Sequence, residues 1–265
     1  MKLTSSLLSK HEELVMALRE LKLPTIVQEF TAIAKEAEKC KLTYEQYLFK
    51  LLETELQVRR HNRVKKLLRE AKLPLTKTLE QYDFALRTGI TDKEFGRLCS
   101  GEFIKKAENV VFYGTFGVGK THLAIILAQK ACELGYHCYY TSTHNLINQL
   151  LTAKKNLEIN TWMKRLDRFD LLVCDELGYT PHDQDGADLF FQLISQRAER
   201  KSIVITTNLT YSEWDKVFLN PLATAAAVDR IIHKCNTFNI QGPSFRSLEA
   251  KNRSKGLTQE MEERT

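Results

Sequence analysis

The residues Gly114–Thr121 constrain this 265-residue chain more than any other stretch, because they read GTFGVGKT and match the pattern G-x-x-x-x-G-K-[ST]. The apolar run 108–113 comes directly before them and is typical of a buried parallel strand. The run 122–134 follows as a strong helix former that stops at Gly135. Strand, glycine-rich turn and helix is the context of a phosphate-binding P-loop, which a chance match in an isolated turn lacks.

Each residue type in this turn has a task in holding a polyphosphate. Glycines allow a tight turn whose N–H groups point inward, and the positive end of the following helix adds to their attraction for phosphate. We expect Lys120 to reach the β- and γ-phosphates and the Thr121 hydroxyl to bind Mg²⁺. The predicted nucleotide-binding residues are Gly114, Thr115, Phe116, Gly117, Val118, Gly119, Lys120, Thr121 and His122.

Two later strands end in polar side chains that suit phosphate chemistry. The apolar run 170–174 is followed by Asp175 and Glu176. At the end of a strand after a P-loop, the first acid helps to hold Mg²⁺ and the second is placed to polarise a water for attack on the γ-phosphate. The run 201–208 ends in Asn208, which we expect to orient this water, the alternative being an Asn that caps the next turn.

The basic excess of the chain lies at its N-terminal end. Residues 1–75 hold 15 Lys and Arg against 10 Asp and Glu, whereas the remainder holds 24 against 23. Such asymmetry indicates an acidic polymer as partner. The six cysteines form no C-x-x-C pair, and no apolar stretch reaches the roughly 18 residues of a membrane span. We therefore expect a soluble, cytoplasmic protein with reduced thiols.

Capping patterns and apolar spacing predict helices over 9–23 and 25–39 and another starting at residue 43. We expect a helical domain over 1–75, an α/β ATPase domain over 76–250 and a polar tail over 251–265. The segment 59–72 carries seven basic residues against one acid, Glu70. It predicts a helix on DNA phosphates, the alternative being a solvated face. The candidate DNA contacts are Arg59, Arg60, Arg63, Lys65, Lys66, Arg69 and Lys72, with Lys154, Lys155, Lys164 and Arg165 in addition.

Two aromatic residues, Tyr82 and Phe84, stand just ahead of the P-loop domain. A segment in this place can fold over the nucleotide and stack on its base, and both rings are candidates for that contact. The alternative is that they close the edge of the domain as core. The following stretch, 93–106, is predicted to be a helix that leads into the strand before the P-loop.

The strings GTFGVGKTHLA, LVCDELGY, ITTN, DRIIH and GPSFR, in this order, resemble the IstB-like ATPases, which are helper proteins of bacterial insertion sequences related to the DnaC loaders and DnaA initiators of the AAA+ class. The resemblance covers most of residues 78–250, and the helical segment before them also fits the family. It implies an AAA+ P-loop fold with a three-layer αβα core and a parallel sheet. It also implies a homo-oligomer that binds ATP and Mg²⁺ on double-stranded DNA and assists the transposase of the same element in target selection and insertion.

Carried onto this chain, the resemblance gives Lys120 and Thr121 the Walker A roles, Asp175 and Glu176 the Walker B roles, and Asn208 the sensor-1 role. Arg230 resembles an arginine finger that reaches the γ-phosphate of a neighbouring subunit, the alternative being a salt bridge with Asp229 or Asp215. Arg246 resembles a second sensor arginine. After Ile240 only 25 residues remain, so no full C-terminal lid is expected.

Three other functions remain open on the sequence alone. The first is a helicase loader or replication initiator, which shares the fold and differs in its partner. The second is a monomeric nucleotide kinase or GTPase, which the absence of N-K-x-D and the presence of Glu176 disfavour. The third is a DNA-binding scaffold that binds ATP without hydrolysing it.

Overall fold

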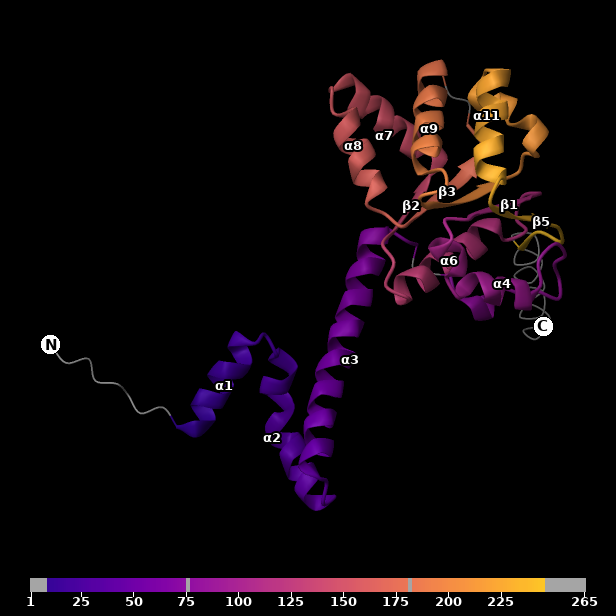
Figure 1. Cartoon of the computed structure of the whole chain (residues 1–265). Coiled ribbons are helices and arrows are strands. Elements are labelled where there is room, and N and C mark those ends of the chain that lie inside the picture. The colour runs from indigo at the N-terminus through magenta and orange to yellow at the C-terminus, as the bar shows by residue number, and fades with distance from the viewer. Residues whose placement is uncertain (1–8, 75–76, 181–182, 246–265) are drawn as a thin grey trace, which may run out of the picture. The chain divides into compact units, whose positions relative to one another are not determined.

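The computed structural model describes residues 9–74, 77–180 and 183–245, and the chain divides into two compact units, 1–66 and 67–265 (Figure 1). The first unit contains α1 (Lys10–Glu20), α2 (Pro24–Lys39) and most of α3 (Tyr44–Ala71). The predicted helical N-terminal region is thereby confirmed, and the third helix and the basic segment prove to be one continuous helix. The division falls inside α3, after Lys66, and the domain boundary at residue 75 stays a prediction.

A buried carboxylate ties α3 to the start of α2. Residue Leu23 offers no side-chain cap, and Glu55 of α3 instead accepts hydrogen bonds from the N–H groups of Thr25 at 2.9 Å and Ile26 at 3.1 Å. Arg59 donates to the other oxygen of Glu55 at 2.7 Å. An anion at a helix N-terminus is favoured by the helix dipole, so this contact stabilises a unit whose apolar core is small.

The second unit is built on a five-stranded parallel sheet with the strand order β2-β3-β4-β1-β5. Its strands are β1 (Asn109–Gly114), β2 (Cys138–Ser142), β3 (Leu171–Leu177), β4 (Ser202–Thr207) and β5 (Cys235–Ile240). The central strands β1, β3 and β4 are buried along most of their length because helices cover both faces. The carboxyl ends of β1, β3 and β4 therefore meet at one edge, where ligands of open α/β sheets bind.

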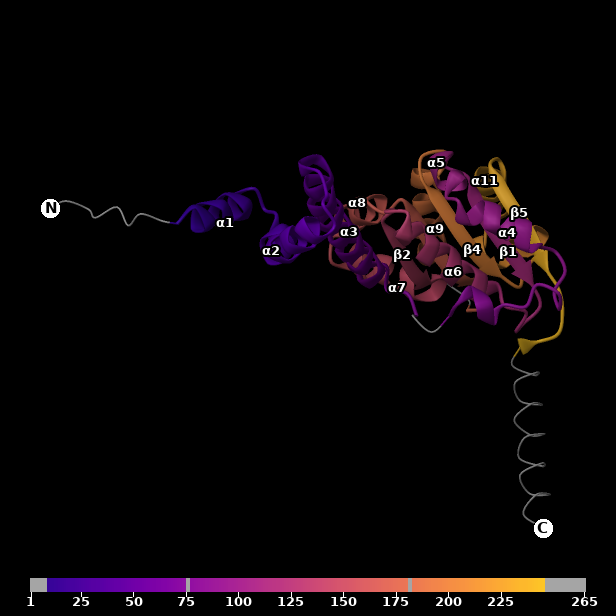
Figure 2. The same ribbon diagram turned by 90° about the horizontal axis from the view of Figure 1, so that it is seen from below.

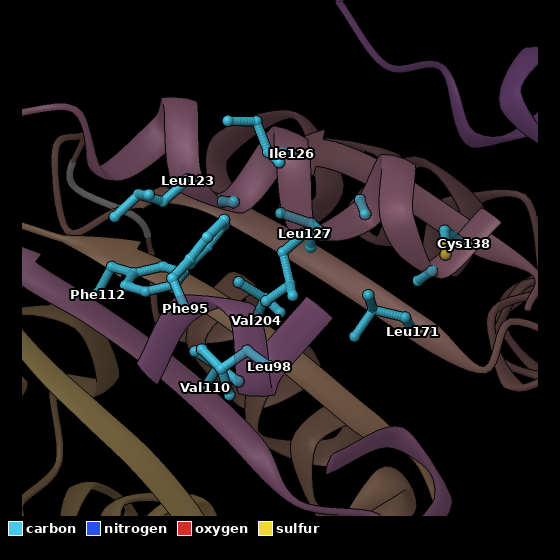
Figure 3. Packing of buried hydrophobic residues seen from close by; sticks show 14 of the residues in the cluster. Phe95, Leu98, Val110, Phe112, Leu123, Ile126, Leu127, Cys138, Leu171 and Val204 are labelled. Carbon is cyan, nitrogen blue, oxygen red and sulfur yellow. The ribbon is translucent and has the colours of Figure 1, made fainter. Parts of the chain in front are cut away.

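Two layers of helices enclose this sheet (Figures 1 and 2). One layer holds α4 (Asp92–Cys99), α5 (Glu102–Lys105) and α6 (Lys120–Glu133). The other holds α7 (Thr143–Lys155), α8 (Ile159–Asp167), α9 (Gln184–Arg197), α10 (Asp215–Phe218) and α11 (Pro221–Ile232). Figure 3 shows the first core, in which Leu123 and Leu127 of α6 lie beside Phe95 of α4 and Val204 of β4. The predicted three-layer α/β architecture is confirmed.

The prediction of a single helix over 93–106 is wrong. The segment forms two helices, α4 and α5, which are separated at Gly101. This glycine has φ +76°, and a Cβ there would lie 2.8 Å from the Leu134 side chain.

All six cysteines are free thiols, as expected. None of the described helices is both long and apolar enough to span a bilayer. The predicted absence of a full C-terminal lid concerns residues 246–265, which lie outside the described residues.

We predict that Glu55→Ala lowers the free energy of unfolding of the full chain by about 2 kcal/mol, because two buried N–H groups lose their acceptor. Urea unfolding followed by circular dichroism measures this loss. Glu55→Gln keeps an acceptor oxygen and should lose less, and Glu53→Ala on the exposed face of α3 is the matched control. Equal stability of the Glu55→Ala and Glu53→Ala proteins would contradict the capping role.

Burial pushes the pKa of Glu55 up, but the hydrogen bonds from Arg59, Ile26 and Thr25 outweigh it and lower the pKa below 4.5. A carboxylate with a lowered folded pKa contributes its full stability above the unfolded pKa and loses it as the pH falls through the folded one. The stability difference between wild type and Glu55→Ala should therefore shrink below pH 4.5.

Candidate nucleotide-binding site

The predicted P-loop connects β1 to α6, whose first residue is Lys120. Its glycines are required by the backbone conformation of the turn and also by the close approach of other segments to the loop. Gly114 has φ +144°, and a Cβ there would lie 2.0 Å from the Ile240 carbonyl oxygen. Gly119 has φ +99°, and a Cβ there would lie 2.7 Å from the Tyr82 ring. Any larger residue would push away the segments that support the loop from outside.

Two segments far from the loop in sequence hold it in place. After β5 the chain passes along the loop, and Phe245 N donates to the Gly117 carbonyl at 2.9 Å. The buried Arg87 donates from Nε to the Val118 carbonyl at 3.2 Å, with its guanidinium 3.8 Å from the centre of the Phe245 ring. Sequence reasoning missed Arg87, because no motif surrounds it.

A cavity of about 480 Å³ opens beside this loop, within the size range of small-molecule sites. Seven predicted residues line it: Phe116, Gly117, Gly119, Lys120, Thr121, His122 and Glu176. Four lining residues were missed: Lys77, Gln81, Tyr179 and Phe245. Two of these stood in the DELGY and GPSFR strings, and the other two flank Thr78 just ahead of the P-loop domain.

Lys120 is buried and is held by the loop itself. Its Nζ donates to the carbonyl oxygens of Gly114 at 2.8 Å and Thr115 at 2.7 Å. Burial lowers the pKa of Lys120 to about 8, and the charges of Asp175 and Glu176 oppose this shift. An ammonium with three donors and two carbonyl partners keeps one donor for a phosphate oxygen.

The buried Asp175 carboxylate lies against Thr121. The Thr121 hydroxyl donates to Asp175 Oδ1 at 2.9 Å, and two further hydroxyls, those of Tyr140 and Thr206, also donate to this carboxylate. Hydroxyl and carboxylate oxygens are the hard ligands that Mg²⁺ takes. Thr121 and Asp175 therefore fit the predicted metal role and are the residues that would hold Mg²⁺ here.

Glu176 is exposed, lines the cavity and has a left-handed backbone with φ +61°. A non-glycine residue in this conformation needs support, and its N–H donates to Thr206 Oγ1 at 2.9 Å. The side chain of Asn208, just after β4, has a buried Oδ1 without a hydrogen-bond partner among the described residues. The turn there is closed by Thr207, whose Oγ1 accepts from Leu209 N at 3.0 Å, so Asn208 is not its cap.

The two aromatic candidates for base stacking lie in the core and do not line the cavity. Tyr82 is 4% exposed and contacts Phe84 and His122, while Phe84 packs against Phe95. This is the arrangement of the alternative in which the rings close the domain edge. His122 lines the cavity, its Nε2 lies 2.7 Å from the Thr78 carbonyl, and burial lowers its pKa. A stacking role for Tyr82 and Phe84 stays a prediction.

Arg230 is exposed on α11 and does not line the cavity of its own chain. Its Nη1 donates to the Ala226 carbonyl at 2.9 Å, and its guanidinium lies 5.3 Å from the centre of the Phe191 ring. Within the described ranges it forms no salt bridge with Asp229 or Asp215, which was the alternative to an arginine finger. The remaining predicted arginine, Arg246, lies outside the described residues.

Some of the candidate DNA contacts already form hydrogen bonds or ion pairs with other groups of the chain. Arg59 is bound to Glu55 and to the Lys22 carbonyl, and Lys154 forms an ion pair with Asp185 at 3.1 Å. All eleven candidates are exposed: Arg59, Arg60, Arg63, Lys65, Lys66 and Arg69 on α3, Lys72 just after it, Lys154 and Lys155 on α7, and Lys164 and Arg165 on α8. A DNA-binding role for all of them stays a prediction.

We predict that the titration of Lys120 leaves ATP affinity unchanged below pH 8 and lowers it by up to about tenfold per pH unit above pH 8. Above this pH the Lys120 side chain of the nucleotide-free protein is neutral, and it must take up a proton when ATP binds. Calorimetry in buffers of different ionisation heat should show proton uptake at pH 9. Lys120→Arg is the control, since arginine stays protonated throughout this range. An equal decline in the Lys120→Arg protein would contradict the assignment.

Comparison with known proteins agrees with this geometry. Residues 16–255 match the family described as IstB-like ATP binding protein. A protein named for ATP binding in insertion sequence IS21 of Pseudomonas aeruginosa is 34% identical over 239 residues, which cover 90% of each chain. A counterpart from IS5376 of Geobacillus stearothermophilus is 32% identical, covering 87% of this chain and 92% of that protein.

The crystal structure of DnaI superposes with a TM-score of 0.52 at 17% identity, covering 67% of this chain and 94% of that one. This likeness concerns the fold alone, and with the parallel sheet it confirms the predicted α/β P-loop fold. The match to the family over residues 16–255, together with the two insertion-sequence relatives, shows that this chain belongs to the IstB-like ATP-binding proteins.

Proposed function

We propose that the protein binds ATP with Mg²⁺ and hydrolyses it at this site, as a homo-oligomer that assists a transposase on double-stranded DNA. One observation carries the hydrolytic part. The carboxylate that contacts Thr121 and the carboxylate that faces the cavity are consecutive residues, Asp175 and Glu176, with opposite environments. A buried acid that suits a metal ion beside an exposed acid that suits a water is the division of labour that triphosphate hydrolysis needs.

In this proposal each group of the chain has one task. The loop N–H groups and Lys120 hold the phosphates, and Thr121 and Asp175 hold the metal ion, which supplies charge neutralisation when bound. Glu176 accepts the proton of the attacking water, and Asn208, directly after the neighbouring strand β4, is assigned to orient this water. Aromatic rings that line the cavity, among them His122 and Phe245 with nearly parallel rings 6.4 Å apart, are the candidates for contact with a base.

An arginine is absent from the described residues that line the cavity. We propose that a second copy of the chain supplies it, through Arg230. Support comes from the exposure of Arg230 on α11 and from the absence of an acidic partner among the described residues. A finger supplied in trans makes hydrolysis depend on assembly, and such residues contribute roughly 10³–10⁵ in rate.

The proposed partners are DNA and the transposase of the same insertion element. Exposed basic side chains on α3, α7 and α8 support contact with phosphates, and the relatives named after insertion sequences support the transposase. A helicase loader is the second candidate function, because the IstB-like ATPases that the sequence resembles are related to the DnaC loaders. Co-purification with the transposase and with the replicative helicase decides between them, since each function needs a different partner.

We predict that Glu176→Gln keeps ATP binding and lowers kcat by about 10²–10⁴, because the water loses its base. Hydrolysis by the assembled protein on DNA, with nucleotide affinity measured in parallel, provides the test. Asp188→Asn, which changes an exposed acid on α9, is the matched control. Wild-type turnover in the Glu176→Gln protein would remove the assigned base.

We predict that Arg230→Ala abolishes hydrolysis in the assembled protein without weakening ATP binding, because the arginine acts on a neighbour. Mixing this variant with Lys120→Ala tests the geometry in trans, since one protein then supplies nucleotide-loaded sites and the other supplies fingers. Hydrolysis should reappear in the mixture alone. A mixture as inactive as its components, with both proteins still co-assembling on DNA, would contradict the finger.

We predict that DNA affinity falls steeply with salt and shows little sequence preference. The slope of log K against log salt should decrease in magnitude by about 0.9 for each phosphate contact removed. Arg60→Ala with Lys65→Ala, both exposed on α3, should therefore flatten the slope by about 1.8, whereas Lys93→Ala on α4 should leave it unchanged. Affinity that does not change with salt would exclude phosphate contact.

A further inference from the structure

Two hydroxyl groups that have no assigned task in the nucleotide-binding motifs lie against the acids at the end of β3. Tyr140 of β2 donates from its OH to Asp175 Oδ2 at 2.6 Å. Thr206 of β4 donates to Asp175 Oδ1 and accepts from the N–H of Glu176 at 2.9 Å. We propose that Tyr140 and Thr206 are positioning residues, the first for the metal-binding carboxylate and the second for both acids. This inference rests on the proposed ATPase function.

The pairing of β3 with β4 explains why one threonine reaches two acids. Cys174 lies opposite Ile205 and Leu177 opposite Thr207, with a shift of register between them. Asp175 and Glu176 therefore share the single opposing residue Thr206, which is the arrangement of a β-bulge. Bulges beside active sites re-aim a side chain, and here Asp175 is buried while Glu176 faces the cavity.

The Thr206 hydroxyl supports this bulge from both sides. It serves as acceptor for the Glu176 N–H and as donor to the Asp175 carboxylate, so the two acids are linked through one oxygen. The backbone of Glu176 is left-handed, with φ +61°, and such a conformation persists only where its surroundings hold it. Without this hydroxyl, the Glu176 N–H loses its acceptor. The backbone from which the water-activating carboxylate extends is then no longer held in place.

Tyr140 acts on the metal-binding acid from the opposite strand. Its phenolic OH can donate, and it gives this hydrogen bond to Asp175 Oδ2. By occupying Oδ2 it directs Oδ1 towards Thr121. Neutral donors orient the carboxylate without cancelling its charge, and Asp175 forms no salt bridge among the described residues. Its negative charge thus remains for a cation.

The experiment compares Tyr140→Phe and Thr206→Val with wild type and with Thr206→Ser, which restores the hydroxyl. Three quantities are measured: affinity for a non-hydrolysable ATP analogue in EDTA, affinity of the protein–analogue complex for Mn²⁺ by electron paramagnetic resonance, and kcat as a function of Mg²⁺ concentration. The analogue affinity in EDTA reports whether the fold and the phosphate loop are intact, independently of the metal.

For Tyr140→Phe we expect the Mn²⁺ affinity to fall by about 10- to 100-fold, as for other groups that orient a metal ligand, and kcat to return at saturating Mg²⁺. For Thr206→Val we expect the same loss of metal affinity but a kcat that stays low at saturating Mg²⁺, because Glu176 is also displaced. Thr206→Ser should restore both quantities. Analogue affinity in EDTA should stay within about twofold of wild type in all three.

Unchanged Mn²⁺ affinity in Tyr140→Phe would overturn the role of Tyr140. Full recovery of kcat in Thr206→Val at saturating Mg²⁺ would overturn the link between Thr206 and Glu176. If Thr206→Val fails to fold, Thr206→Ala gives the same two readouts. A wild-type protein that shows no Mg²⁺-dependent hydrolysis would instead refute the proposed function, which keeps the two failures apart.

Discussion

A buried carboxylate at the end of β3 brings together hydroxyl groups from three other elements. Asp175 accepts from Thr121 of α6, Tyr140 of β2 and Thr206 of β4, and none of these hydroxyls neutralises it. A buried charge held by neutral donors is costly unless a cation completes the site, and this cost is the physical reason to place Mg²⁺ there. The positions of the P-loop and of Glu176 follow from the same carboxylate, because Thr121 links it to the loop and Thr206 links it to Glu176.

The phosphate loop depends in the same way on segments that its motif does not contain. Its glycines face the Ile240 carbonyl and the Tyr82 ring, and its carbonyl groups accept from Phe245 N and from Arg87. The chain after β5 therefore passes directly along the loop.

Much of this site followed from local patterns. A glycine-rich turn between an apolar strand and a helix encodes its own geometry, so the places of Lys120 and Thr121 at the start of a helix could be predicted, as could the strand that carries Asp175. Two contacts gave no such signal: the Glu55 cap on α2 and the Arg87 contact with Val118. Each joins residues about 30 or more positions apart, and local spacing carries no record of such a pair.

The sequence by itself determined the class of the protein, because strand, loop, helix and acid-tipped strand are properties of consecutive residues. Family membership rests on the same consecutive strings. Only the tertiary structure decided which hydroxyls hold the acids, since Tyr140 and Thr206 meet Asp175 through neighbouring strands. The register shift that sets Asp175 and Glu176 against one threonine is a relation between β3 and β4, and pairing of strands becomes definite only when the sheet is assembled.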